Sequence, residues 1–432
     1  MTDEHGAACG CNEYQELSRR EFLSTTAGIS GSVYAASAFP GWLPRVVLAE
    51  HYSATRDVMV SVFQRGGVDG LAMCIPFTDP AYYAGRPTIA TPAPDSLAAN
   101  RAIALDGTWA IPPGMLGVGP AYEAQDMLIA HAVGLTTKSR SHFDAQRWME
   151  VGKMADPNLV TGWLGRHIAS VPPMRADALL RGMGVASGLP KTLVGAPKTL
   201  PIPDPANYTL AGSSSTRTAR LSVLEGDYGL TAEPLRSNAL DAVNTIELLA
   251  TLGINQYVPA NGVVYPNTAF GRALRSVAAL IKSDIGLEAA QVDIGGWDTH
   301  AQQDPNAGAM FALMQNFAGS LGAFWADVID TGYPATLVAV SEFGRNVREN
   351  GSAGTDHGRG TTMFAMGRSI AGGRVLADWP GISQNQLEDN QDLQVTIDYR
   401  DILAEIVQNR LENPNLGVVF PGYTPTFRGV TR

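Results

Sequence analysis

The stretch VMVSVFQRGGVDGL, residues 58–71, decides the fold. Its first six residues are apolar apart from one serine, which is typical of a strand buried on both faces of a sheet. Two glycines follow, and they permit a tight turn close to the backbone that presents Asp69. Other segments of the chain share this pattern.

Apolar strand segments alternate with helical ones along the chain. Further strands are predicted at 127–133, 290–294, 335–340 and 363–366, and helices at 141–151, 270–281 and 310–328. Alternation of this kind predicts an α/β fold in which a mostly parallel sheet is sandwiched by helices. Residues 190–238 are rich in Pro, Ser and Thr. With a helix near 239–252, they are interpreted as an inserted lobe (about 190–250) over one edge of the core; a solvated loop without a role is the alternative.

The first fifty residues predict an export signal. SRREFL at 18–23 carries a twin-arginine pair, and residues 22–44 are uncharged but too weakly apolar for a stable membrane span. We therefore predict a twin-arginine signal peptide over 1–49, the twin-arginine (Tat) translocase as partner during export, and a mature domain over 50–432 that is periplasmic or secreted. Cleavage near Ala38 is an alternative, as is a chance arginine pair on an amphipathic helix.

Charge and cysteine content exclude two classes of protein. The formal charge of −10 argues against nucleic acid as a partner, because phosphate-backbone binding needs a basic surface. Cys9 and Cys11 leave with the predicted signal, so Cys74 alone cannot form an internal disulfide. We interpret Cys74 as a buried small hydrophobe, and His131 and His167 as structural histidines.

Carboxylates and imidazoles follow several of the predicted strands. Sites in parallel sheets form beyond the carboxyl ends of the strands, where these residues would meet. Asp298 and His300, if extended, point to the same side roughly 6.5–7 Å apart, and the neighbours Asp356 and His357 lie between glycines. With Asp69 they are the candidate ligands of a divalent metal ion (Zn, Mg, Ca or Mn). The alternative is a set of Asp–His hydrogen bonds that order loops.

Ser141 is the candidate nucleophile. It would open a helix, where free backbone N–H groups and the helix dipole stabilise an attached anion. Lys138 and Arg140 precede it and suit a phosphate or sulfate ester. Equally, Ser141 and Asp144 form a capping pair that explains both residues without chemistry. Fallback nucleophiles are Ser139 and Thr137.

Several motifs together resemble a bacterial family of exported proteins still classed as a domain of unknown function. They include RGGVDGL at 65–71, DPAYYAGRPTIA at 79–90, SRSHFDAQRWMEVG at 139–152, GGWDTHAQQ at 295–303, SEFGR at 341–345 and GTDHGRG at 354–360. The resemblance covers nearly the whole mature chain. That family is grouped with the alkaline phosphatase-like superfamily, so the resemblance implies an alkaline phosphatase-like core.

The resemblance also implies roles for the candidate residues. In the superfamily's order, they are Asp69 after the first strand, Ser141 as nucleophile, the pair Asp298 and His300, and the adjacent pair Asp356 and His357. Two departures stand out: one residue separates Asp298 from His300 where three are usual, and no histidine follows His357. One metal, or a site completed by Glu342 or His142, is therefore expected.

These observations predict an exported metal-dependent hydrolase of phosphate or sulfate esters. Ser141 would attack a small-molecule or glycan ester, and Lys138 and Arg140 would hold the anion's remaining oxygens. The alternative is a non-catalytic cell-envelope protein that uses the same fold to bind an anionic glycan or a protein partner.

Overall fold

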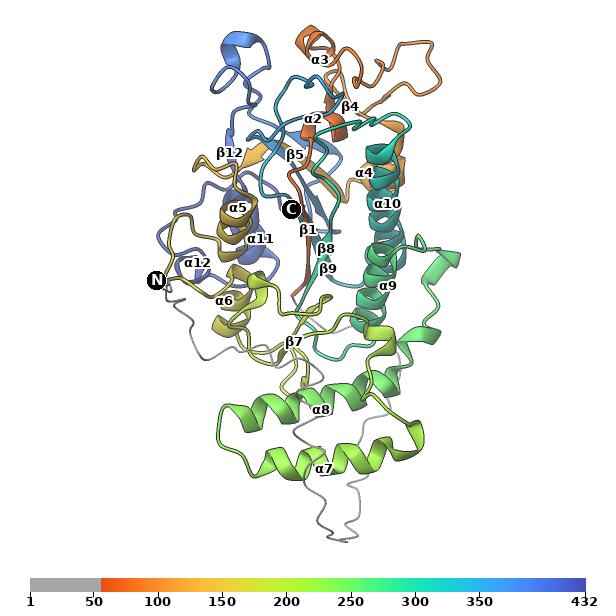
Figure 1. The fold of residues 1–432 in the computed structure, drawn as a ribbon, viewed down its shortest axis with the longest axis vertical. Helices are drawn as coiled ribbons and strands as arrows, with labels where there is room; N and C mark the ends of the chain where they lie inside the picture. The colour runs from red at the N-terminus through yellow and green to blue at the C-terminus, as the bar shows by residue number, and fades with distance from the viewer. Residues whose placement is uncertain (1–55) are drawn as a thin grey trace, which may run out of the picture.

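The computed structural model describes residues 56–432. Its main element is a nine-stranded sheet with the strand order β11-β5-β10-β9-β1-β8-β6-β7, and β12 beside β5 (Figure 1). The strands are β1 Val58–Gln64, β5 Met127–Gly134, β6 Gly182–Gly184, β7 Thr199–Pro201, β8 Ala289–Ile294, β9 Ala335–Val340, β10 Thr361–Met366, β11 Arg374–Leu376 and β12 Ile397–Asp398. The five predicted strands are all present. The predicted signal, residues 1–49, lies outside the described residues and stays a prediction.

The sheet is parallel except at β10. β1 pairs parallel with β8 and β9, whereas β10 runs antiparallel to both of its neighbours, β9 and β5. The segment from 341 to 360 that joins β9 to β10 contains no crossover helix, so the chain returns at the edge where β9 ends. Residues after β9 and residues before β10 therefore lie at the same edge as the carboxyl ends of the parallel strands.

Helices cover both faces of the sheet, as predicted. Within β1, Val58, Val60 and Val62 pack on one side, while Met59 and Phe63 pack on the other, so the alternation of the strand feeds two cores. The first face carries α4 Gly119–Glu123, α9 Ala269–Lys282 and α10 Ala309–Phe324; the second carries α5 His142–Val151, α6 Trp163–Ser170, α11 Tyr399–Asn409 and α12 Leu416–Val419 (Figure 1).

Smaller elements lie at the two ends of the molecule. α2 Gly70–Met73, α3 Pro80–Gly85 and a three-stranded sheet (β2 Ile75–Pro76, β4 Trp109–Ile111, β3 Ile103–Ala104) follow the carboxyl end of β1. At the opposite end, α7 Arg217–Gly229 and α8 Leu235–Leu252 form the inserted lobe (Figure 1). The helix predicted near 239–252 is present as α8. The sequence did not predict α7, because its apolar stripe is short: Leu221 and Leu224 are buried in a small cluster with Leu210 and with Val243 of α8.

Three single residues match their predicted structural roles. Cys74 is buried and free, and burial raises the pKa of its thiol. His131 is buried: its Nδ1 accepts from the Ala132 N–H (2.8 Å), and its Nε2 donates to the Cys74 carbonyl (3.0 Å). His167 is buried and bonded to Asn413 (3.1 Å). Within residues 56–432, no helix combines the length and apolar character needed to cross a membrane.

The buried histidines predict acid sensitivity. Burial lowers the pKa of His131 to about 4, whereas an unfolded histidine titrates near 6.5. Between about pH 6.5 and pH 4, the unfolded chain therefore binds a proton at this residue and the folded chain does not. The free energy of unfolding should therefore fall by about 2 kcal/mol between pH 7 and pH 5 through His131 alone. Urea titrations at both pH values should show a smaller drop for His131→Gln. An equal drop in both proteins would contradict the prediction.

Candidate metal centre

Three histidines from distant parts of the chain meet beyond the carboxyl edge of the sheet. His142 is the first residue of α5, eight positions after the end of β5. His300 follows β8, and His357 lies in the segment between β9 and β10. They come together because the parallel strands end, and β10 begins, at this one edge.

The Nε2 atoms of these histidines converge on the carboxylate of Asp298. The Nε2 of His357 lies 3.1 Å from the Nε2 of His142, 3.0 Å from the Nε2 of His300 and 3.0 Å from Oδ1 of Asp298. Asp298 Oδ1 is also 3.0 Å from the Nε2 of His300, and its Oδ2 is 3.6 Å from that of His142. The ligand atoms of His142, Asp298 and His357 all lie within 4.8 Å of one another.

The other ring nitrogen of each histidine faces a hydrogen-bond acceptor. The Nδ1 pairs are His142 with Glu342 (2.8 Å), His300 with Asp356 (2.9 Å) and His357 with the backbone carbonyl of Arg140 (3.1 Å). In a neutral imidazole only one nitrogen carries the proton. In the metal-free protein the Nε2 of His357 can donate to Oδ1 of Asp298. With the protons on Nδ1, where the three acceptors lie, each Nε2 would present a lone pair to the common point.

This donor set fits a metal ion. With the protons on Nδ1, three lone pairs and a carboxylate oxygen at about 3 Å would repel one another unless a cation lies between them. Ligands at about 2.0–2.1 Å from a tetrahedral zinc ion are about 3.3 Å apart. The ligand atoms of His142, Asp298 and His357 all lie within 4.8 Å of one another, and the Nε2 of His300 lies 3.0 Å from both His357 and Asp298. Imidazole nitrogen with one carboxylate favours zinc and similar ions over magnesium or calcium, which prefer oxygen.

The four donors are open to solvent. The exposed fractions of the side chains are 44% for His300 and 47% for Asp298, and 26% and 21% for His142 and His357. Structural zinc sites are closed by protein ligands, whereas catalytic ones keep an accessible position. Four protein donors would fill a tetrahedral ion, whereas the set of His142, Asp298 and His357 would leave one position accessible on this exposed surface.

Arg345 fastens the surrounding loops and holds Asp298. Its buried guanidinium donates to the carbonyls of Gly67 (2.6 Å), Trp297 (2.9 Å) and Thr355 (2.9 Å) and to Oδ1 of Asp298 (2.6 Å). Although burial raises the pKa of Asp298, hydrogen bonds from Arg345 and a histidine lower it to about 2. Asp298 is thus ionised. Sequence reasoning missed this role; the only signal was the arginine of the SEFGR motif.

Two glycines allow these loops to approach. Gly66 has φ +124°, and a Cβ there would lie 2.6 Å from the backbone nitrogen of Asp298. A Cβ on Gly354 would lie 2.3 Å from the carbonyl carbon of His300. Both distances are shorter than side-chain atoms tolerate, so larger residues would push the ligand loops apart.

The structure places Asp69 outside this cluster. The glycine turn does present Asp69, but its carboxylate is buried and bound by Arg86 at 2.6 and 3.0 Å and by Gln303 at 2.6 Å. The same Gln303 accepts hydrogen bonds from Thr299 (3.0 Å) and Thr355 (2.7 Å), which adjoin the ligand residues. Asp69 thus anchors the loops that carry the histidines, and its oxygens are not free for a metal.

Asp356 lies on the outer side of His300. Its Oδ1 accepts from the Nδ1 of His300 and from Asn350 (3.1 Å), and the first of these bonds is the main cause of its lowered pKa. Of the five predicted ligands, the structure brings Asp298, His300 and His357 to the common point, with Asp356 behind His300. His142, which the sequence offered as one way to complete the site, supplies the remaining imidazole, with Glu342 behind it.

Ser141 caps the helix that begins with His142. Its exposed hydroxyl accepts from the backbone N–H of Asp144 (3.4 Å), and Gly152, with φ 72°, ends the helix as predicted. The capping interpretation is therefore correct for this bond. A long, single hydrogen bond leaves the hydroxyl accessible, so the role of nucleophile stays a prediction.

Both predicted anion-binding cations are engaged by carboxylates of the segment 388–392. Lys138 pairs with Glu388 (3.0 Å) and Asp389 (3.0 Å), and Arg140 pairs with Asp392 (2.6 Å). An anionic ester would have to displace these carboxylates in order to reach either cation.

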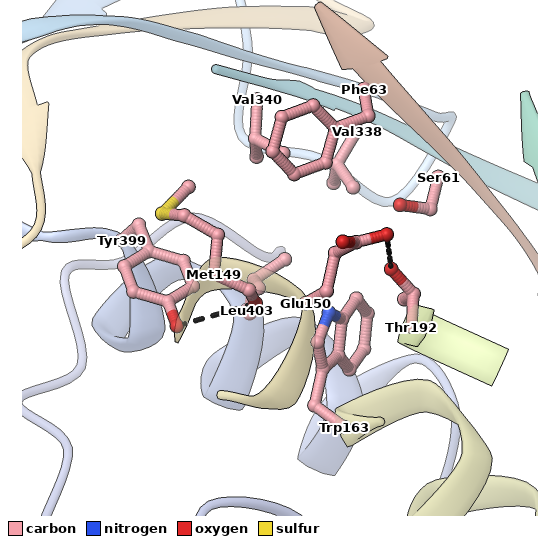
Figure 2. Close-up of a pocket in the computed structure, with 10 residues that line it drawn as sticks. All are labelled: Ser61, Phe63, Met149, Glu150, Trp163, Thr192, Val338, Val340, Tyr399 and Leu403. Atoms are coloured by element: carbon pink, nitrogen blue, oxygen red, sulfur yellow. Dashed lines mark hydrogen bonds between the residues drawn. The ribbon is translucent and has the colours of Figure 1, made fainter. Parts of the chain in front are cut away.

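A separate pocket lies between the sheet and the helices α5 and α11 (Figure 2). Its volume is about 10 Å³, room for one water molecule. Glu150, one of its polar residues, accepts from Thr192 (3.4 Å) and pairs with Arg65 (2.9 Å). This pocket is too small for a substrate and belongs to the core.

A family model described as a protein of unknown function, DUF1501, matches residues 158–411. No curated protein matches the chain significantly. A solved structure of a protein in the alkaline phosphatase superfamily from Vibrio parahaemolyticus matches with a TM-score of 0.34 and 11% identity, covering 76% of this chain and 64% of that one. This chain thus spans less than two thirds of that protein's length, and the α/β fold assignment rests on the sheet itself.

Proposed function

The chain belongs to the DUF1501 family of proteins of unknown function, and from its site we propose that it is a metal-dependent hydrolase of phosphate or sulfate esters. We place this activity in the periplasm or outside the cell, because the sequence carries a predicted twin-arginine signal. The observation that carries the proposal is the solvent-open convergence of three imidazole Nε2 atoms on Asp298, each with its Nδ1 already bonded.

Each group has a proposed task. His142, His300, His357 and Asp298 would hold one divalent ion. Such an ion supplies Lewis acidity, which neutralises charge on the ester and lowers the pKa of a hydroxyl or water. Ser141, directly before His142, would attack from the helix N-terminus, where backbone N–H groups favour an anion.

Ser141→Asn tests the nucleophile without removing the cap. Asparagine caps helices as well as serine does, so the variant should keep the wild-type melting temperature. Turnover should nevertheless fall to background, and Ser141→Thr, which keeps a hydroxyl, should retain part of it. The measurement is hydrolysis of chromogenic phosphate and sulfate esters by protein loaded with Zn²⁺. Full activity in Ser141→Asn would leave Ser141 only its capping role.

One observation favours the non-catalytic alternative, a cell-envelope protein that binds an anionic glycan or a partner. The carboxylate pairing of Lys138 and Arg140 leaves neither cation free for a transferring group. Stoichiometric metal together with turnover of any ester would support the hydrolase. Stoichiometric metal without turnover on the whole panel would support the alternative.

A further inference from the structure

Glu342, which the sequence offered beside His142 as a residue that could complete the site, lies fully buried behind His142. Its Oε1 accepts from the backbone of Gly66 (2.9 Å), from the Nδ1 of His142 (2.8 Å) and from Gln146 (2.8 Å). Its Oε2 accepts from the hydroxyl of Ser341 (3.0 Å). Four hydrogen bonds fix both the carboxylate and the plane of the imidazole.

This buried carboxylate has no cationic side chain of its own. Two other buried acids have one: Asp69 pairs with Arg86, and Asp327 pairs with Lys282 at 2.6 Å. Among residues 56–432, the ion-pair partner of Glu342 is the imidazole of His142, at 2.8 Å. A buried charge without a counter-charge is strongly unfavourable. A cation bound at the Nε2 of His142 would place a positive charge on the far side of the ring that Glu342 holds.

The side chains around the centre favour a divalent ion. Asp298, Glu342 and Asp356 are carboxylates in contact with the three imidazoles, and Arg345 is the guanidinium bonded to Asp298. With neutral histidines these groups leave a net charge of −2, which one divalent cation balances.

We propose that Glu342 is the positioning residue that gives the centre its affinity for a divalent metal ion. It holds His142 with the Nε2 lone pair inward and supplies a negative charge that solvent does not screen. Asp356 does the same for His300, but its side chain is 58% exposed, so water weakens its effect. This inference rests on the metal centre of the proposed function. It adds that the buried carboxylate of Glu342 contributes more to metal affinity than the exposed carboxylate of Asp356.

Glu342→Gln and Asp356→Asn form a matched pair for the test. Both keep one oxygen that can accept from the histidine, remove the charge and turn the second oxygen into an N–H₂ donor. Calorimetric titration with Zn²⁺ alone should show about 10- to 100-fold weaker binding in Glu342→Gln, and a smaller loss in Asp356→Asn. Equal losses, a larger loss in Asp356→Asn, or wild-type affinity in Glu342→Gln would overturn the proposal.

A second background shows whether the effect passes through His142. In His142→Asn, which lacks the Nε2 ligand, adding Glu342→Gln should change Zn²⁺ affinity by no more than about twofold. A tenfold further loss would overturn the proposed route. If Glu342→Gln does not fold, Glu342→Asp replaces it: the shorter side chain keeps the charge but withdraws from the ring, and unchanged affinity would contradict the proposal.

The two proposals fail in different ways. The titrations need no substrate, so a protein that binds Zn²⁺ in the expected order but hydrolyses no ester would refute the proposed hydrolase and leave the role of Glu342 intact. A wild-type protein that binds no divalent ion would refute both.

Discussion

His357→Asn is expected to abolish specific Zn²⁺ binding, with the affinity falling about 100- to 1,000-fold. Zinc sites of four ligands contribute about 10–16 kcal/mol of binding free energy, so one ligand accounts for about a quarter of it. His357 is the largest single loss because its Nε2 contacts all three other donors. The stabilisation of the folded protein by Zn²⁺, about 4 kcal/mol at a thousandfold excess over Kd in the wild type, should disappear with it.

Without metal, the substitution should not lower the free energy of unfolding. The amide of asparagine reaches about as far as Nδ1, so it can keep the hydrogen bond to the Arg140 carbonyl. The crowded Nε2 atom is removed. We therefore expect His357→Asn with chelator to be at least as stable in urea as the wild type with chelator.

His167→Asn is the matched control. His167 is a buried histidine that is bonded to Asn413. Among the described residues, its hydrogen bonds do not include one to any residue of the cluster. It should lower stability and leave Zn²⁺ affinity unchanged. Strong Zn²⁺ binding by His357→Asn would show that the ion binds at another place in the protein.

The sequence predicts the interior of the sheet well because those strands are long and apolar. It does not predict the short strands β6, β7, β11 and β12, which have two or three residues and no measurable period. It also leaves the direction of β10 open. That direction matters, because only an antiparallel β10 returns the segment carrying His357 to the edge where β1 and β8 end.

The site was predictable where position along a strand decided it. Asp298 and His300 follow β8, and His357 precedes β10. All three lie at the carboxyl edge of the parallel strands, where they meet. The hydrogen-bond partners of the histidines were not predictable, because they depend on ring orientation in the packed structure. Glu342 and Asp356 lie next to Ser341 and His357 in sequence, yet nothing in the spacing says which is a ligand and which stands behind one.

Asp69→Asn should be costly for a different reason from a lost ligand. The carboxylate and the guanidinium of Arg86 are 1% and 0% exposed, and their closest contact is 2.6 Å. Removing one partner leaves an uncompensated buried charge, which typically costs about 3–5 kcal/mol. We therefore expect the free energy of unfolding of the metal-free protein to fall by this amount in urea titrations with chelator present.

The double variant Asp69→Leu with Arg86→Met separates the two roles of Asp69. If Asp69 is an anchor, replacing both charges with apolar groups should recover part of the lost stability, because no charge is left buried alone. If Asp69 were in addition a metal ligand, Asp69→Asn would also abolish Zn²⁺ binding. That second result would mean that Arg86 releases the carboxylate when a cation arrives, and it would return Asp69 to the ligand set.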